Sequence, residues 1–282
     1  MQTVGLTWQH AFEAAAVLAV GGSALAVSKN RVTRAVGAFA RETAVIGVLY
    51  GVWQLAGRIS VTSGVEAARD RAHWIADFER YLPLPSERST QSVVLGHRQV
   101  VEAANLYYAS MHMTIMLTFL IWLFVRHRDQ YRPVRQVMAW TTLGCLLVQL
   151  MPVAPPRMMP GIVDTALELH QSVYSTGLPI DQLSAMPSVH VAWAVIVGYY
   201  AWRVGTSRWR YLGAAHAVTT FLVVVVTGNH WWLDGIVAVA ILVVCAWGVY
   251  GVRTAWHAAL DRLRVQRGFA EPDALPEAVG VG

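Results

Sequence analysis

Long apolar runs separated by short polar or basic stretches organise this chain of 282 residues. A run of about 20 apolar residues is long enough to cross a bilayer as one helix. The pattern predicts spans at residues 6–27, 44–57, 105–125, 137–151, 187–204, 211–226 and 231–252. The first run also carries His10 and Glu13, so we treat it as an extra N-terminal span beside a core of six helices. The predicted fold class is therefore an all-α integral membrane protein.

The stretch between the second and third runs, residues 58–103, has mixed charge and a different pattern. Large apolar side chains recur there at helical spacing within residues 65–81, and they are Trp74, Ile75, Phe78 and Tyr81. This spacing predicts an amphipathic helix that lies on the membrane surface or against the bundle. A solvated loop helix without a lipid role fits the same pattern. Prolines 83 and 85 should end the helix.

The runs also divide the chain into three parts. Residues 1–40 comprise the N-terminal span and a basic loop, and residues 41–255 form the membrane-embedded domain. Residues 256–282 form a cytoplasmic tail, which from Gly268 onward has the composition of a disordered segment. No internal repeat and no second soluble domain is expected.

Composition supports this class and argues against a nucleic-acid partner. Hydrophobic residues make up 55% of the chain and charged residues only 14%, whereas soluble domains have roughly 25% charged residues. The net charge of +5 is carried almost wholly by arginine. In a soluble protein this charge would raise the question of nucleic-acid binding. Here the bias of basic residues toward one side of a membrane explains it better, so membrane lipids are the expected partners.

Basic residues are distributed unevenly over the connections between the predicted spans. Alternate assignment of the connections brings four short basic segments to one side: residues 28–43, 126–136, 203–210 and 253–267. The other side receives the arginines of the long stretch before residue 103, which alternate with acids and count for less. The positive-inside rule therefore predicts a multi-pass plasma membrane protein with a cytoplasmic C-terminus. The amphipathic helix and the polar residues described next fall on the extracytoplasmic side.

His230 and Asp234 stand at the start of the last run, four residues apart. On a helix this spacing places both side chains on one face. A carboxylate can hold one imidazole nitrogen as N–H and leave the other free as a nucleophile or base. An isolated match of this kind is more often a polar pair packed at a helix end.

Two further polar groups stand at the ends of other runs. Pro187 suits the first turn of a helix, so Ser188 and His190 lie where unpaired backbone N–H groups can bind phosphate. A capped helix start with a satisfied histidine is the alternative. Arg157 follows two prolines and suits a bidentate contact with an anion. An arginine that reaches to the lipid headgroups is the alternative for Arg157.

Taken together, these residues form a constellation for phosphoryl transfer. Arg157 and Ser188 would hold the phosphoryl oxygens. His230 would attack phosphorus, oriented by Asp234, and His190 would protonate the leaving oxygen. Two other readings remain open. One is a non-enzymatic membrane transporter or lipid-binding protein, and the other is a zinc site made by the two histidines and the aspartate.

The motifs resemble those of the type 2 phosphatidic acid phosphatase superfamily, which also includes vanadium haloperoxidases. The matching elements are Pro155-Pro156-Arg157, Pro187-Ser188-Val189-His190 and Asn229-His230 with Asp234. The residues of these motifs are similar to those of the branch that includes fungal inositol phosphorylceramide synthase and its bacterial relatives. The resemblance covers roughly residues 40–255. It implies a core of six membrane helices, no metal or other cofactor, His230 as nucleophile and His190 as acid.

The resemblance also implies the substrate class: lipid phosphates, polyprenyl diphosphates, or a phosphoinositol headgroup moved between lipids. Three family positions differ, because Leu150, Val223 and Val224 stand where the fuller pattern has Lys, Ser and Arg. Two phosphate-binding cations are thus absent, and the candidates to replace them are Arg58, Arg71 and Arg98. Other polar residues that could line the pocket are His112, Tyr108, Asn105 and Asn229. Hydrogen bonding between helices is the alternative role for those in the third run.

Overall fold

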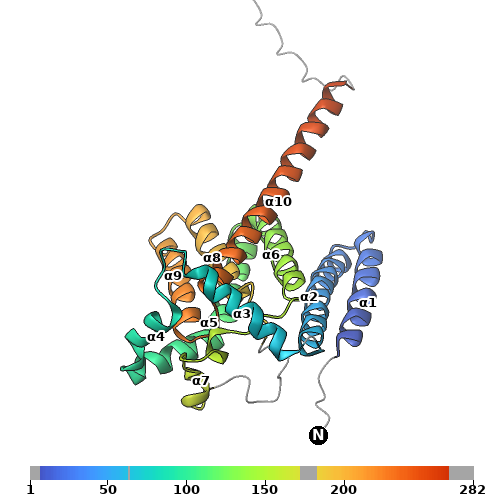
Figure 1. The fold of residues 1–282 in the computed structure, drawn as a ribbon. Helices are drawn as coiled ribbons and strands as arrows, with labels where there is room; N and C mark the ends of the chain where they lie inside the picture. Colours follow the sequence, from blue (N-terminus) through green and yellow to red (C-terminus); the bar gives the residue numbers. More distant parts are fainter. Residues whose placement is uncertain (1–6, 63, 172–182, 267–282) are drawn as a thin grey trace, which may run out of the picture.

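The computed structural model describes residues 7–62, 64–171 and 183–266, and these residues are mostly helical (Figure 1). The long helices are α1 (Trp8–Ala26), α2 (Arg31–Thr62), α5 (Arg98–Arg126), α6 (Arg128–Val148), α8 (Val189–Val204), α9 (Arg210–Val226) and α10 (Trp232–Gln266). The shorter ones are α3 (Val65–Glu79), α4 (Glu87–Leu95), α7 (Thr165–Glu168) and the 3-10 turn η1 (Pro156–Met158). The predicted all-α class is confirmed for the described residues. Apart from one isolated β-bridge, these residues contain no β-strand.

Three helices are long and apolar enough to cross a membrane: Arg31–Arg58 of α2, Arg98–Arg126 of α5 and Trp232–Arg262 of α10. Helix α9 is apolar but shorter. These lengths and compositions indicate a multi-pass membrane protein. The other predicted spans also fold as helices, and the full six-span core remains a prediction.

Helices α1 and α2 form a hairpin beside the rest of the molecule (Figure 1). Helix α2 already begins at Arg31, so residues 31–40 of the stretch that was expected to be a basic loop are helical. The helix extends this far because Gly37 packs against α1 instead of breaking α2. A Cβ on Gly37 would lie 2.6 Å from the carbonyl oxygen of Gly22. Two glycines thus let the helices approach closely, as is common between membrane helices.

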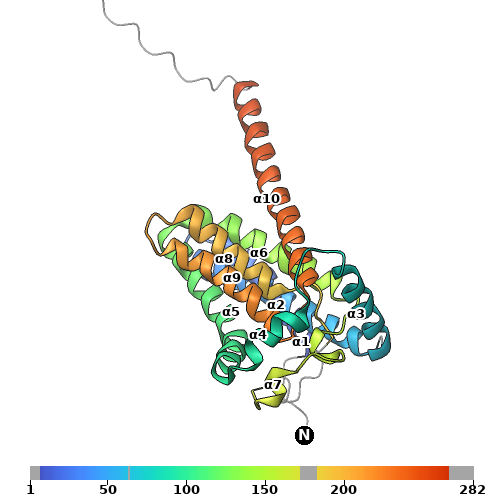
Figure 2. The ribbon, with the colours of Figure 1, turned by 60° about the vertical axis from the view of Figure 1, so that its left-hand side comes forward.

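Five helices, α5, α6, α8, α9 and α10, form the bundle that carries the site (Figure 2). Its core contains Phe119 and Leu123 of α5, Val137 of α6, Ile196 of α8 and Leu242 of α10. Helices α8 and α9 run side by side through facing glycines. A Cβ on Gly198 would lie 3.0 Å from the carbonyl oxygen of Gly213, so larger residues would separate the two helices.

Helix α10 is longer than the sequence pattern indicated. It continues to Gln266 and extends beyond the bundle, whereas the membrane domain was expected to end at residue 255 (Figure 1). The reason is local, because residues 253–266 contain neither glycine nor proline to end a helix. The predicted disordered segment from Gly268 lies outside the described residues.

Helix α3 corresponds to the predicted amphipathic helix and packs against the bundle. Its buried face consists of Ala68, Ala72 and Ile75, which join a cluster with Trp231. Trp74 is 64% exposed and stacks on Phe78, so the large apolar positions do not share one face. Small residues form the contact because α3 approaches the connecting segment closely, where Ala154 N donates to the carbonyl oxygen of Ala68 at 3.1 Å.

Candidate active site

Three segments carry the predicted motifs, and backbone hydrogen bonds tie each segment to the other two. The bonds run from Val153 N to Leu183 O (2.7 Å), Ala185 N to Val153 O (3.3 Å), Arg157 N to Gly228 O (2.8 Å) and Ser188 N to Asp234 O (3.1 Å). Backbone groups that are paired in this way cannot move separately without losing buried hydrogen bonds. The motif residues are therefore held in a fixed arrangement.

His230 lies in the turn between α9 and α10, and Gly228 shapes that turn. Gly228 has a φ of +69°, in the left-handed region that favours glycine. A Cβ at this position would also lie 3.2 Å from Cβ of Arg157. After the turn, the N–H groups of Asn229 and His230 both donate to the carbonyl oxygen of Val224, at 3.1 and 3.0 Å. The glycine thus permits the close contact between the first and third motifs.

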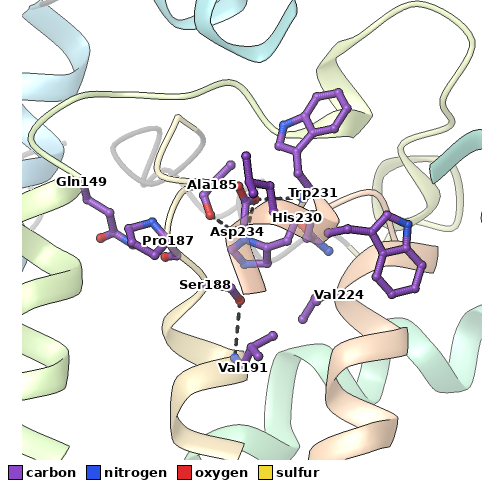
Figure 3. A network of polar contacts seen from close by, with 12 residues as sticks. Gln149, Ala185, Pro187, Ser188, Val191, Val224, His230, Trp231 and Asp234 are labelled. Atoms are coloured by element: carbon purple, nitrogen blue, oxygen red, sulfur yellow. Dashed lines mark hydrogen bonds and ion pairs between the residues drawn. The ribbon is translucent and has the colours of Figure 1, made fainter. Parts of the chain in front are cut away.

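The His230 ring is buried and held through one nitrogen (Figure 3). Its Nδ1 lies 2.6 Å from the carbonyl oxygen of Ala185 and 3.3 Å from Oδ2 of Asp234. Because a carbonyl oxygen can only accept, Nδ1 carries the proton. The other nitrogen, Nε2, then keeps its lone pair. This is the tautomer that a histidine nucleophile needs.

Asp234 is fully buried and makes two contacts through Oδ2. That oxygen meets the His230 ring and also accepts from Trp231 N at 2.8 Å. The expected orienting partner of His230 is thus in place. The shorter contact of the ring is nevertheless to Ala185, so Asp234 fixes the turn as much as it fixes the imidazole.

His190 stands in the first turn of α8, with its ring centroid 5.6 Å from that of His230. Tyr108 stacks on His190 at 4.6 Å, and His112 meets it edge-on at 4.2 Å. Nδ1 of His112 donates to the carbonyl oxygen of Tyr108 at 3.0 Å. Three imidazoles and a phenol therefore share one pocket, where they could pass protons to and from a bound group.

A cavity of about 530 Å³ opens at these rings. One wall contains residues of the three motif segments: Arg157, Ala185, His190, Asn229 and His230. A second wall, called here the α2 wall, is mostly apolar and contains Ile46, Leu49, Tyr50 and Trp53. Residues of α5 and α6, including Tyr108, His112 and Gln149, complete the lining.

Arg157 lines the same cavity as His190 and His230. It donates to Oδ1 of Asn229 at 2.5 Å, and its Nε lies 3.5 Å from Oδ2 of Asp164. The side chain is 5% exposed and lines the cavity. A positive charge with fixed partners on one edge is suited to hold an anion on another.

Two predicted site residues, Ser188 and Asn105, do not line this cavity. The Ser188 hydroxyl caps α8 by accepting from Val191 N at 3.4 Å, and the fully buried residue does not line the cavity. Asn105 bonds to Thr165 at 2.9 Å and to Gln171 at 3.0 Å, also away from the cavity. Ser188 thus bonds within its own helix, whereas Asn105 bonds to residues distant in the sequence. Both contacts fit the alternatives from the sequence, a helix cap and a bond between elements, and the roles of the two residues at the site stay predictions.

The candidates to replace the absent cations also lie outside the cavity lining. Arg58 is exposed, and Arg98 pairs with Glu102 on the surface. Arg71 donates through Nε to the carbonyl oxygen of Pro152 at 2.6 Å, which supports the loop before Arg157. Val223 and Val224 are buried, where a charged residue would lack water and partners. Among the residues that line the cavity in the described chain, Arg157 is the arginine that remains.

The described residues contain no group of three or more His, Cys, Asp or Glu that could hold a metal ion. The zinc reading of His190, His230 and Asp234 would need Nδ1 or Nε2 of each ring to face one ion. Nδ1 of His230 faces a carbonyl oxygen, so Nε2 would have to be the ligand, and the zinc reading stays a prediction.

Sequence reasoning missed the Ala185 carbonyl and the α2 wall of the cavity. A backbone carbonyl carries no residue signal, and α2 is distant in the sequence from the motifs. It also missed Gln149, whose Nε2 donates to the carbonyl oxygen of Pro187 at 3.0 Å. A glutamine near the end of an apolar run was the available signal for Gln149.

Comparison with known proteins identifies one family. A family model described as the PAP2 superfamily matches residues 73–248, which is more than half of the chain. The match begins within α3 and ends within α10, so it includes all three motif segments and leaves α1 and α2 outside. No curated protein and no solved structure matches the chain.

Proposed function

The chain belongs to the PAP2 superfamily, and from that premise we propose that it is a metal-independent lipid phosphatase or phosphotransferase. Membership of this superfamily points to a function of phosphatase or phosphotransferase type. The proposed substrates are lipid phosphates or diphosphates, or a phosphoinositol-type headgroup moved between lipids. The observation that carries the proposal is His230, held at Nδ1 with Nε2 free, opposite His190 and beside Arg157.

The first chemical step forms a phosphohistidine. Nε2 of His230 attacks phosphorus, and the bond between phosphorus and the leaving oxygen breaks. His190, protonated at the start, gives its proton to that oxygen. The guanidinium of Arg157 balances the negative charge on the other phosphoryl oxygens. Asp234 and the Ala185 carbonyl stabilise the imidazole as positive charge develops on it.

The second step releases His230. Water or a lipid hydroxyl attacks phosphorus, the bond to Nε2 breaks, and His190 takes the proton of the attacking group. Water gives hydrolysis, whereas an alcohol gives transfer. The resemblance to the inositol phosphorylceramide synthase branch favours transfer. Access of water to the cavity favours hydrolysis.

The apolar α2 wall supports a lipid substrate. Ile46 and Tyr50 line the cavity and are also 66% and 38% exposed, so the wall continues onto the outer surface of α2. That helix is one of the three apolar enough to span a membrane. A lipid could therefore place its phosphate at Arg157 and its chains along α2. The distribution of basic residues supports the proposal that the site lies on the extracytoplasmic side of the plasma membrane.

The test uses the full chain, purified in detergent, with lipids labelled in the phosphate group. Phosphatidic acid, a polyprenyl diphosphate and phosphatidylinositol are each supplied with and without a diacylglycerol or ceramide acceptor. Free phosphate that is lost in both His190→Ala and His230→Ala would support a phosphatase. Label on the acceptor would support a transferase.

Absence of turnover over the whole panel would contradict the proposal. Lipid binding that survives His230→Ala, without turnover, would favour the non-enzymatic alternative. Loss of turnover on addition of a chelator would favour the zinc alternative over the phosphohistidine.

A further inference from the structure

Three buried carboxylates meet at the first turn of α10, directly after His230. The first N–H groups of a helix have no partner within the helix, and one side chain usually caps them. Here three consecutive N–H groups each donate to a different carboxylate. The bonds run from Trp231 N to Asp234 Oδ2 (2.8 Å), Trp232 N to Glu87 Oε1 (3.4 Å) and Leu233 N to Glu79 Oε1 (2.6 Å).

Two of these carboxylates come from the segment between α2 and α5, for which the sequence indicated no role. Glu79 ends α3 and Glu87 begins α4. They are 7% and 5% exposed, and within the described residues neither forms an ion pair with a cation. Burial of two carboxylates without a cation is costly unless a proton or hydrogen bonds compensate.

The geometry indicates a proton between these two side chains. Oε2 of Glu79 meets no donor among the described residues, and the carboxyl groups of Glu79 and Glu87 are neighbours because they accept from successive N–H groups of α10. Two adjacent carboxyl groups in a buried site cannot both ionise easily. Burial, followed by the hydrogen bond and the charge of Glu87, raises the pKa of Glu79 to about 9. At neutral pH Glu79 then keeps its proton and can donate it to the carboxyl group of Glu87.

We propose that Glu79 and Glu87 share one proton, hold the first turn of α10 in place and thereby position His230 for phosphoryl transfer. The inference rests on the function proposed above. Glu79 and Glu87 do not touch the cavity, so they are positioning residues. They act through the backbone of α10, which carries Asp234 and follows His230 directly.

Loss of the shared proton should loosen this arrangement. The pair would then carry two negative charges beside Asp234, which is the other charged group that acts on Glu79 among the described residues. The positive end of the helix dipole offsets only part of this repulsion. A small displacement of the first turn would move His230 relative to Arg157, and misplacement by about 1 Å can lower a rate by about 100-fold.

The activity test uses an aryl phosphate ester, whose leaving group needs no proton from His190. Wild-type kcat should fall as the pH rises past about 9, where Glu79 loses its proton. Glu79→Ala should lower kcat at neutral pH by at least about tenfold and leave KM within about twofold. Glu79→Gln, whose amide still donates to Glu87 and accepts from Leu233 N, should restore most of kcat without the alkaline fall. Asp77→Asn, on the exposed side of α3, is the matched control and should behave as wild type.

An unchanged alkaline fall in Glu79→Gln would overturn the proposal. So would a Glu79→Ala protein in which only KM changes.

A second measurement needs no turnover. The Tm of wild type and Glu79→Gln is compared from about pH 5 to pH 10. In wild type the unfolded chain releases the Glu79 proton near pH 4.5, whereas the folded chain keeps it up to about pH 9. Wild-type stability relative to Glu79→Gln should therefore fall between these values and level off above them.

The two measurements distinguish a failure of the shared-proton inference from a failure of the proposed function. A pH-independent difference in Tm would show that no proton is shared and would overturn the inference. If no phosphate ester is turned over by wild type, the proposed function fails and the positioning role fails with it. The Tm comparison still decides whether the shared proton exists.

Discussion

The two walls of the cavity are built in different ways. On the motif wall, Arg157 and His230 are about 5% exposed and their segments are joined by backbone hydrogen bonds. On the α2 wall, Ile46 and Tyr50 contribute side-chain surface that is also open to the outside. The motif wall lies within the family match, whereas α2 lies before it. Under the proposed function, chemistry would depend on the fixed polar network, and the fit of a lipid chain would depend on the apolar hairpin.

The contacts of the α1–α2 hairpin fit this difference between the two walls. Helices α1 and α2 pack closely on each other through Gly22 and Gly37. One ion pair, between Glu42 of α2 and Arg135, joins the hairpin to α6. Changes on the motif wall should therefore affect kcat, whereas changes on the α2 wall should affect KM for long-chain lipids.

The largest effect is expected at His190. His190→Ala should lower kcat for an alkyl phosphate by about 10²–10⁴-fold, because the proposed mechanism gives His190 the role of protonating the leaving oxygen. With an aryl ester the rate of the first step, measured as the burst of released phenol, should fall by less than about tenfold, since that leaving group departs without a proton. His73→Ala, on the exposed side of α3, is the control. An equal loss on both substrates would contradict the role as acid.

Arg157 should give the next largest effect. Arg157→Lys keeps the charge but loses the planar fork that reaches Asn229 and the phosphoryl oxygens together. We expect kcat to fall by about 10²–10³-fold, as when one stabilising donor is removed from a transition state. Arg98→Lys, at an exposed ion pair, should have no effect. Steady-state kinetics and Tm of both proteins check this, because a large drop in Tm would indicate a fold defect instead.

A substitution in the α2 wall should give the smallest effect, and it should change KM instead of kcat. Trp53→Ala removes apolar surface from the cavity, and each lost contact with a chain methylene is worth at most about 0.8 kcal/mol. KM for a long-chain lipid phosphate should rise by about three- to tenfold, with kcat and the KM of a short-chain analogue unchanged. Val48→Ala, on the same helix but outside the cavity lining, serves as control. A fall in kcat on the short-chain analogue would remove the distinction between the two walls.

Local patterns in the sequence determined much of this protein. Runs of apolar residues must bury their backbone polar groups in helices within a membrane, so the helices could be predicted. Short spacings also predicted local contacts, because His230 and Asp234 lie about one helical turn apart. The same logic failed at helix ends: residues 31–40 and 256–266 are helical because nothing in them stops a helix.

Tertiary structure alone decided which polar groups meet at the cavity. Ser188 and Asn105 are residue types that could line the site, but their side chains form hydrogen bonds with the N–H of Val191 and the amide of Gln171. The Ala185 carbonyl fixes the tautomer of His230, yet every residue has a carbonyl, so no sequence pattern marks this one. The carboxyl pair of Glu79 and Glu87 forms only when α3 and α4 fold against α10. Burial changes what a side chain does, and burial depends on contacts between segments that are far apart in the chain.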